Sequence, residues 1–296
     1  MNYKVNYSEA DKISGFLELQ KVIEEKHEKH ENFFIGRLSG NETRLIGLLL
    51  AGKDYKHMID IVKNCSGIHI TNLQSLKHYF DAYLKSVHNS TILGVWDKLM
   101  YKQCEDFYYH LETKMKKKCI PAESLELFRY LKLDEYKFPE LVENKRILVI
   151  TSHKVTTEGQ IKNLNYIFKD KIIFKNNSFI IVKPPVTLAG NHNNIDWEVH
   201  FKKFTEELLK YKDKFDVAFV SCGGYGMITC DFIFNTMNRS CIYNGGVQQL
   251  YFGIHGNRWN KNTIIQTYSK DNPYWVHVDK NETPSNYHRL EQGCYW

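Results

Sequence analysis

The sequence predicts an α/β protein with a mostly parallel sheet and helices on both of its faces. Short apolar runs alternate with longer stretches of helical periodicity, which is the pattern of βαβ units. The runs at 146–151 and 216–221 are almost continuously apolar, as expected for strands buried on both faces. Glycine-rich turns at 222–226 and 245–246 follow the apolar runs at 216–221 and 240–243. Because βαβ crossovers are right-handed, their helices are expected to cover both faces.

In the first half of the chain, residues 9–30 have the clearest helical pattern, because apolar residues recur there with a period near 3.6. Residues 33–38 predict a buried strand. Ser39 or Asn41 can then cap a helix at 42–51. Further helices are expected at 54–64, 72–86, 97–118 and 122–132, and further strands at 67–70 and 90–95.

The second half is more regular. Strands are expected at 146–151, 172–174, 179–182, 216–221 and 240–243, and helices at 157–168, 197–211, 227–237 and 247–252. A proline pair at 184–185 begins a loop that runs to about residue 195. From residue 253 the chain is expected to be loop, with its aromatic end packed back on the domain. We predict a single domain over 1–296; two lobes divided near residue 140, in the polar stretch 132–145, remain an alternative.

Composition excludes several classes of protein. The chain has 296 residues, of which 43% are apolar and 25% charged, as in ordinary globular proteins. Its longest apolar runs are far shorter than the roughly 18 residues needed to span a bilayer, and its first ten residues lack the apolar core of a secretory signal. Seven cysteines, an odd number with no C-x-x-C pair, argue against a disulfide framework or a zinc knuckle. These features predict reduced thiols, a cytoplasmic location and no transmembrane segment.

The charge pattern favours a small anionic ligand over nucleic acid. The net charge of +6 is spread along the chain, apart from a lysine cluster at 114–118 that we interpret as a solvated helix end. Nucleic-acid binding is therefore not expected, whereas a mildly basic surface would help an anionic molecule to reach its site. Aromatic residues make up 14% of the chain, and some of them suit a cleft that stacks a sugar or a base.

Ligands of open α/β sheets bind outside the carboxyl ends of the strands, so the turns after the predicted strands are the candidate site. After 216–221 come Gly223, Gly224, Tyr225 and Gly226, and then a helix. Glycine permits close approach of a ligand, and a helix N-terminus suits phosphate. The alternative is a tight turn that needs glycine only for its geometry. Neither the G-x-G-x-x-G spacing of dinucleotide sites nor a P-loop occurs here.

The turn after 240–243, one βα unit further along the chain, is also rich in glycine and precedes a predicted helix. Gly245 and Gly246 precede Gln248 and Gln249, whose amides suit hydroxyl-rich ligands, although polar capping of a helix is the alternative. Earlier in the chain, Arg37 could bind a phosphate or pair with a carboxylate.

Glu42 either acts in the site or merely caps a helix. The loop at 184–196 carries His192 and Asp196 among several asparagines and predicts an acceptor or lid segment; a plain surface loop is the alternative.

Several of these segments resemble GT-D-type glycosyltransferases. The resemblance lies in 36–42, 215–218, 222–226, 245–249 and 252–259. It implies a Rossmann-like transferase that acts on a nucleotide-sugar, often UDP-linked, bound by the lobe at 141–296. It also implies a divalent cation, Mn²⁺ or Mg²⁺, held by an Asp-x-Glu element. Here Gly40 and Asn41 occupy the first two positions of that element and only Glu42 matches, so a metal-independent site stays open as well.

The resulting hypothesis is a glycosyltransferase that moves a sugar from a nucleotide-sugar to a glycan or glycoprotein acceptor. The two glycine turns would hold the diphosphate, and candidate bases for the acceptor hydroxyl are Glu42, Asp196, His192 and Glu158. The expected donor-binding residues are Arg37, Gly40, Asn41, Gly223, Gly224, Tyr225, Gly226, Gly245, Gly246, Gln248 and Arg258. Alternatives are a SAM- or nucleotide-dependent transferase of another class and a non-catalytic carbohydrate- or nucleotide-binding module. Association into a homo-oligomer is left open.

Overall fold

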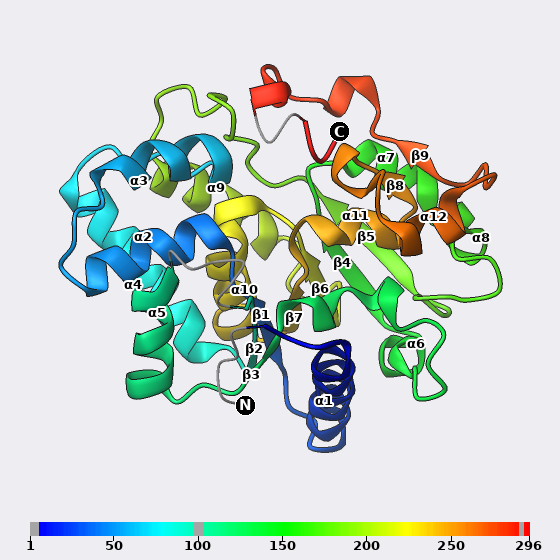
Figure 1. Cartoon of the computed structure of the whole chain (residues 1–296). Helices are drawn as coiled ribbons and strands as arrows, with labels where there is room; N and C mark the ends of the chain where they lie inside the picture. Colours follow the sequence, from blue (N-terminus) through cyan, green and yellow to red (C-terminus); the bar gives the residue numbers. More distant parts are fainter. Residues whose placement is uncertain (1–5, 98–103, 290–292) are drawn as a thin grey trace.

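The computed structural model describes residues 6–97, 104–289 and 293–296, which form a seven-stranded sheet in the order β3-β2-β1-β7-β6-β4-β5 (Figure 1). The strands are β1 (Phe34–Arg37), β2 (Ile92–Val95), β3 (Cys119–Pro121), β4 (Arg146–Ile150), β5 (Ser178–Val182), β6 (Val217–Val220) and β7 (Ser240–Tyr243). Every neighbouring pair in this sheet is parallel. The predicted α/β class with a parallel, Rossmann-like sheet is therefore confirmed.

The order of the strands brings the two halves of the chain into one sheet. The chain steps outward from β1 through β2 to β3, begins again on the other side with β4 and β5, and returns through β6 to β7. Because β7 pairs with both β1 and β6, the strands that precede residue 140 and those that follow it form one continuous sheet. The ends of β1, β7, β6 and β4 consequently lie side by side at one edge.

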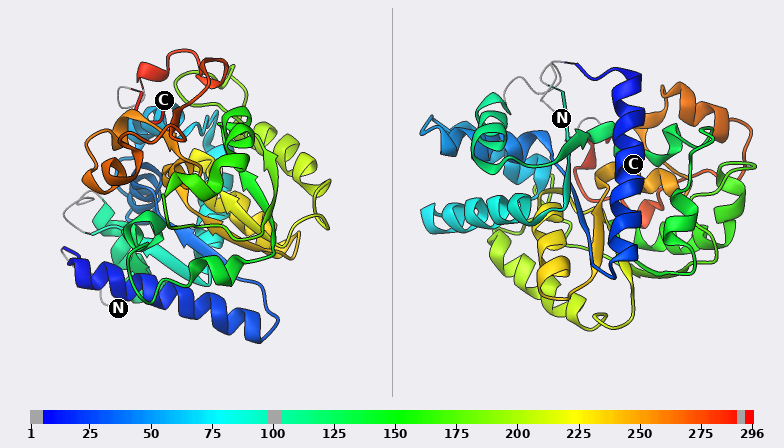
Figure 2. Two further views of the ribbon diagram at one scale, coloured as in Figure 1. Left: turned by 90° about the vertical axis from the view of Figure 1, so that its right-hand side faces the viewer. Right: turned by 90° about the horizontal axis from the view of Figure 1, so that it is seen from below.

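Helices cover both faces of the sheet (Figure 2). The long helices are α1 (Glu9–Glu28), α2 (Gly40–Leu50), α4 (Leu73–Asn89), α9 (Trp197–Leu209) and α10 (Gly226–Asn235). The shorter helices are α3 (Lys56–Ile61), α5 (Glu105–His110), α6 (Phe138–Val142), α7 (Lys154–Gln160), α8 (Leu164–Ile167), α11 (Gln248–Tyr251) and α12 (Thr263–Ser269).

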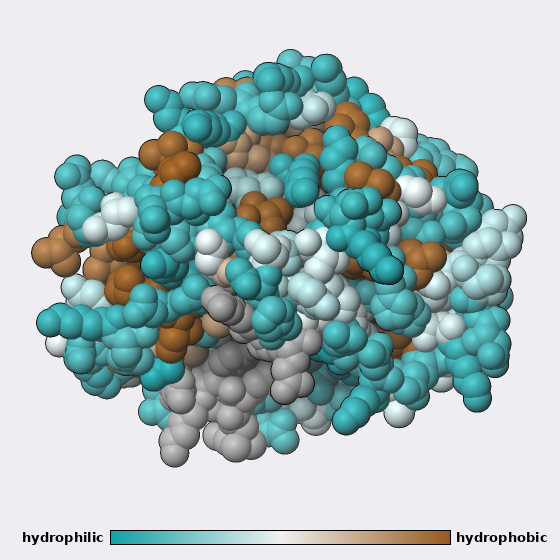
Figure 3. All heavy atoms as spheres, turned by 90° about the horizontal axis from the view of Figure 1, so that it is seen from above, coloured by the Kyte–Doolittle hydropathy of each residue, from teal (hydrophilic) through white to brown (hydrophobic). Residues whose placement is uncertain are grey.

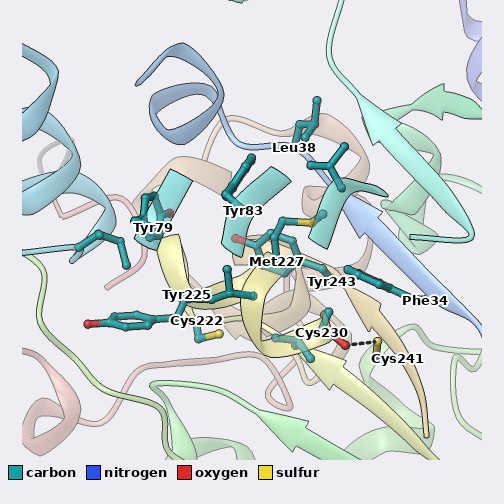
Figure 4. Packing of buried hydrophobic residues seen from close by; sticks show 14 of the residues in the cluster. Phe34, Leu38, Tyr79, Tyr83, Cys222, Tyr225, Met227, Cys230, Cys241 and Tyr243 are labelled. Carbon is teal, nitrogen blue, oxygen red and sulfur yellow. Dashed lines mark hydrogen bonds between the residues drawn. The ribbon is translucent and has the colours of Figure 1, made fainter. Parts of the chain in front are cut away.

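Buried apolar side chains of the described residues form two clusters, one on each face of the sheet. Neighbouring strand residues alternate between them: Phe34 belongs to the first cluster and Ile35 to the second. The first cluster includes residues of α2, α4, α5, α9 and α10, and Figure 4 shows Tyr79, Tyr83 and Tyr243 packed there. The second includes residues of α1, α6, α11, α12 and the C-terminal segment. Burial on both faces explains why the central strands are apolar along their whole length.

Several predicted elements are wrong, because their backbone groups bond elsewhere. Residues 67–70 are not a strand; the His69 carbonyl accepts instead from the amide of Trp197, the first residue of α9, at 3.0 Å. Residues 172–174 lie beside an isolated bridge between Phe168 and Lys171. The predicted helix at 122–132 is two short 3₁₀ turns, and the one at 157–168 is broken into α7, a 3₁₀ turn and α8.

β3 is a strand that the sequence analysis missed. It contains Pro121, which a sheet tolerates here because β3 lies at the edge and pairs only with β2. The helix predicted at 97–118 is represented by α5 and a π turn at Leu111–Met115, and its residues 98–103 lie outside the described residues.

The segment after residue 253 is more ordered than predicted. β8 (Ile254–His255) pairs in parallel with β9 (Val276–His277), and α12 lies between them. The C-terminal aromatic residues do pack back on the domain, since Trp296 is 9% exposed and belongs to the second apolar cluster. Within the described ranges, none of the helices is long and apolar enough to cross a membrane.

Candidate functional site

A cavity of about 570 Å³ lies at the edge where the parallel strands end. Its lining residues come from the segments after β1, β2, β4, β5, β6 and β7, together with 3₁₀ turns near residue 126 and the C-terminal residues. This is where ligands of open α/β sheets bind. On the face of the molecule seen in Figure 3, apolar side chains lie in small separate groups among hydrophilic ones. The cavity is therefore the strongest candidate site.

Of the three glycines in the first glycine turn, Gly223 alone lines the cavity. It has a φ of +54°, which favours glycine, and its carbonyl accepts from the Tyr243 hydroxyl at 2.8 Å. A Cβ at Gly226 would lie 2.1 Å from the Tyr243 ring, and one at Gly224 would lie 2.4 Å from the Ile68 side chain. The glycines at these two positions thus permit close packing behind the cavity wall, the geometric alternative considered above.

Tyr225 is likewise absent from the cavity lining and is 1% exposed. The expectation that Gly224, Tyr225 and Gly226 contact the diphosphate directly is therefore corrected: these residues are covered by Tyr243 and Ile68 or turned into the core.

In the second glycine turn, both Gly245 and Gly246 line the cavity. Gly245 has a φ of +63°, and a Cβ at Gly246 would lie 2.2 Å from the Tyr295 ring, so the C-terminal segment packs directly on this turn. Gln248 does not line the cavity, which corrects its predicted contact with the donor. Its amide donates to the Ile150 carbonyl at 2.9 Å and so ties α11 to the end of β4.

Arg37 is paired with a carboxylate, although not with Glu42. One of its terminal nitrogens donates to Glu126 at 3.1 Å and the other to the Asn244 carbonyl at 2.7 Å, while its guanidinium lies 4.7 Å from the Trp96 ring. Arg129 also donates to Glu126, at 2.5 Å. All of these groups except Asn244 line the cavity, so its charged wall is a linked arginine–glutamate cluster.

Glu42 lies in the first turn of α2 and lines the cavity with Gly40 and Asn41. Its side chain is buried, and the Ser39 hydroxyl donates to one of its oxygens. Burial raises the pKa of Glu42, while hydrogen bonds from Ser39 and Ser66 act in the opposite direction. A carboxyl group with a raised pKa at the wall of a cavity is suited to proton transfer.

The loop residues His192 and Asp196 do not line the cavity. Asp196 caps α9 and accepts hydrogen bonds from Thr71 and Ser75, the latter at 2.7 Å. The His192 ring stacks on His69, with their centroids 4.2 Å apart. The last residues of the loop, 192–196, are therefore folded onto the beginning of α4, whereas its first residues, 184–188, line the cavity. The predicted catalytic placement of both residues is corrected.

Arg258 lines the cavity at its exposed rim, where it donates to the Tyr295 hydroxyl at 2.9 Å and lies over the same ring. Glu158, the remaining candidate base, is exposed on α7, 3.7 Å from Lys154, and does not line the cavity.

Buried polar atoms without a hydrogen-bond partner gather at this cavity. Of eight such side-chain atoms among the described residues, six belong to residues that line it: Arg37 Nε, Glu123 Oε2, Trp259 Nε1, Trp296 Nε1 and both ring nitrogens of His153. Because an unpaired buried polar group costs about 1–3 kcal/mol, such a concentration indicates a binding site for a polar ligand. Sequence reasoning missed His153, although it directly follows the strand predicted at 146–151, where a ligand-binding turn was expected.

The cation that the resemblance implies would meet only one carboxylate at the Asp-x-Glu position. In the part of the chain that the structure describes, no group of three or more His, Cys, Asp or Glu side chains is arranged to hold a metal. At the Asp-x-Glu position, Gly40 has no side chain, and Glu42 accepts hydrogen bonds from serines instead. One carboxylate can hold Mg²⁺ together with waters and the phosphate oxygens of a substrate, so the cation stays a prediction.

No protein-family model, curated protein or solved structure matches this chain. The resemblance to GT-D-type glycosyltransferases consequently rests on the sequence segments named above.

Proposed function

We propose that the protein is a glycosyltransferase that moves a sugar from a nucleotide-sugar, UDP-linked, to a glycan or glycoprotein acceptor. The observation that carries this proposal is the cavity at the strand ends, where two glycine turns meet a charged cluster and unpaired polar atoms. Its volume of about 570 Å³ lies in the range of small-molecule sites.

The diphosphate has a natural place in the middle of the cavity. Gly223, Gly245 and Gly246 carry no side chains there, so a phosphate can approach the backbone. Two of the arginines that line the cavity, Arg37 and Arg129, share the single carboxylate of Glu126. This group carries more positive than negative charge, which would stabilise the leaving nucleoside diphosphate.

The sugar and its acceptor would lie on the Glu42 side. Glycosyl transfer passes through an oxocarbenium-like state, and the acceptor hydroxyl must lose its proton. Of the four bases predicted from the sequence, Glu42 alone lines the cavity. Because burial raises its pKa, its carboxylate is a stronger base than an exposed glutamate. We therefore assign the proton transfer to Glu42, with no step through a metal.

The test has two parts. In the first, melting temperatures are measured with UDP-, GDP-, CMP- and dTDP-sugars, with and without Mn²⁺, and a UDP-sugar should raise the midpoint. SAM and NAD are measured as comparison ligands, and protection by either of them alone would indicate another transferase class. No protection by any nucleotide-sugar would reject the proposal.

The second part is Glu42→Gln, which should lower turnover by roughly 100-fold or more while UDP-sugar protection remains. Glu24→Gln, an exposed position on α1, is the matched control and should keep full turnover. Full turnover by Glu42→Gln would remove Glu42 from the mechanism. Donor binding without transfer or hydrolysis in the wild type would indicate a binding module instead.

A further inference from the structure

His153 is a buried histidine at the cavity wall whose ring has no hydrogen-bond partner. It follows the end of β4, its side chain lines the cavity, and it is only 4% exposed. Neither Nδ1 nor Nε2 finds a partner among the described residues. A neutral imidazole carries one donor and one acceptor, and leaving both unpaired in the interior is costly. The ring is therefore placed for a ligand that offers a matching acceptor and donor.

An aromatic ring lies beside His153, and the charged groups that act on it, Glu282 and Lys183, have opposite signs. Its ring meets Trp296 edge-on, with the centroids 6.0 Å apart, and the Trp296 indole N–H also lacks a partner and lines the cavity. Pro184 lines the cavity just beyond β5, which pairs with β4. Burial lowers the pKa of His153 to about 4, so the ring is neutral at physiological pH. This end of the cavity thus suits a flat, uncharged, polar group.

The position of His153 in the sheet separates it from the charged wall. β4 lies three strands from β1, so the strand ends that carry His153 and Glu42 are about 14 Å apart. The glycine turns after β6 and β7 lie between them. A nucleotide-sugar has the same order of parts, namely a sugar, a diphosphate and a nucleoside.

We propose that His153 and the Trp296 indole N–H bind the nucleoside of the donor, with one ring nitrogen of His153 forming a hydrogen bond to that nucleoside. This inference rests on the proposed function, which places the diphosphate at the glycine turns. Both the imide N–H of uracil and a ribose hydroxyl can form a hydrogen bond with one ring nitrogen, and both moieties offer an oxygen that can accept from the Trp296 indole N–H. The experiment below distinguishes these two sources.

The experiment measures dissociation constants for UDP and for pyrophosphate by calorimetry. His153→Phe keeps a buried ring but removes both nitrogens, and it should weaken UDP about 10- to 100-fold while leaving pyrophosphate unchanged. His153→Gln, whose amide also offers a donor and an acceptor, should recover most of the loss.

Changes to the ligand test the same contact in the unaltered protein. If the base is bound, N3-methyl-UDP should bind the wild type about as weakly as UDP binds His153→Phe; if the ribose is bound, 2′-deoxy-UDP should do so. Because this arm needs no variant, a folding defect in His153→Phe leaves the test intact.

Two results would overturn the inference, and they differ. If wild type binds UDP, and His153→Phe and both modified nucleotides bind as tightly, His153 does not contact the nucleoside, although the proposed function stands. If wild type binds none of the nucleoside diphosphates, the proposed function fails and this inference fails with it.

Discussion

The buried His153 ring should make the free energy of unfolding depend on pH, and the substitution His153→Phe should remove this dependence. Burial lowers its pKa from 6.5 to about 4; nearby Glu282 opposes this shift and Lys183 adds to it. Below pH 6.5 the unfolded chain binds a proton that the folded ring does not bind until about pH 4. The free energy of unfolding therefore falls as the pH drops through this window and is unaffected by His153 above it.

The size of the effect follows from the shift. Lowering the pKa from 6.5 to about 4 corresponds to about 3 kcal/mol of unfolding free energy, of which about 2 kcal/mol should be lost between pH 7 and pH 5. His153→Phe removes the titrating group, so the variant should lose about 2 kcal/mol less than wild type over that interval. At pH 7 the variant should be at least as stable as wild type, because two unpaired buried nitrogens are replaced by carbon.

Urea unfolding of the ligand-free proteins at pH 7 and pH 5, followed by tryptophan fluorescence, measures these differences. The other titrating groups are the same in both proteins, so their contributions to the pH dependence of the unfolding free energy cancel when wild type and variant are compared. An equal loss of stability in wild type and variant would refute the reasoning, since it would mean that the folded ring binds its proton as readily as the unfolded one.

Two further substitutions test the packing of the site. Gly226→Ala should destabilise the fold by about 2 kcal/mol or more, because its Cβ would lie 2.1 Å from the Tyr243 ring; thermal unfolding measures this loss. Glu126→Gln should cost about 3 kcal/mol in urea unfolding, because it removes the negative partner that Arg37 and Arg129 share in a buried position.

Matched controls separate these effects from general sensitivity. Gly159→Ala, at a helical position where an added Cβ meets nothing within 4 Å, should be neutral or slightly stabilising. Glu24→Gln lies on an exposed helix position and should change stability by less than about 0.5 kcal/mol. Gly226→Ala with an unchanged melting temperature, or Glu126→Gln as stable as Glu24→Gln, would contradict the packing described here.

The central strands could be predicted from the sequence because both of their faces pack against apolar side chains. Residues 146–151, 216–221 and 240–243 are buried on both faces, so their apolar character is continuous and local. Residues 67–70 and 172–174 also contain apolar residues, but neither segment pairs with a strand of the sheet. β3 was missed because a proline normally argues against a strand, and only its edge position permits it.

Part of the cavity lining could be predicted from the sequence, because ligands of open α/β sheets bind at the ends of the strands. Arg37, Glu42, Gly223, Gly245 and Gly246 do meet around one cavity, because parallel strands all end at the same edge. The same rule points to the loop that follows β5, whose residues 184–188 do line the cavity, but it does not place His192 and Asp196, whose positions are set by contacts with His69 and with the start of α4.

The amino-acid pattern alone thus determined the α/β class, the central strands and the glycine turns, all of which depend on neighbours close in sequence. The tertiary structure decided which turn residues face the cavity, that Glu126 rather than Glu42 pairs with Arg37, and that His153 is buried without a partner. These facts depend on which distant segments pack together. Burial and pairing of a polar group are properties of its surroundings in space, and the sequence around it does not contain them.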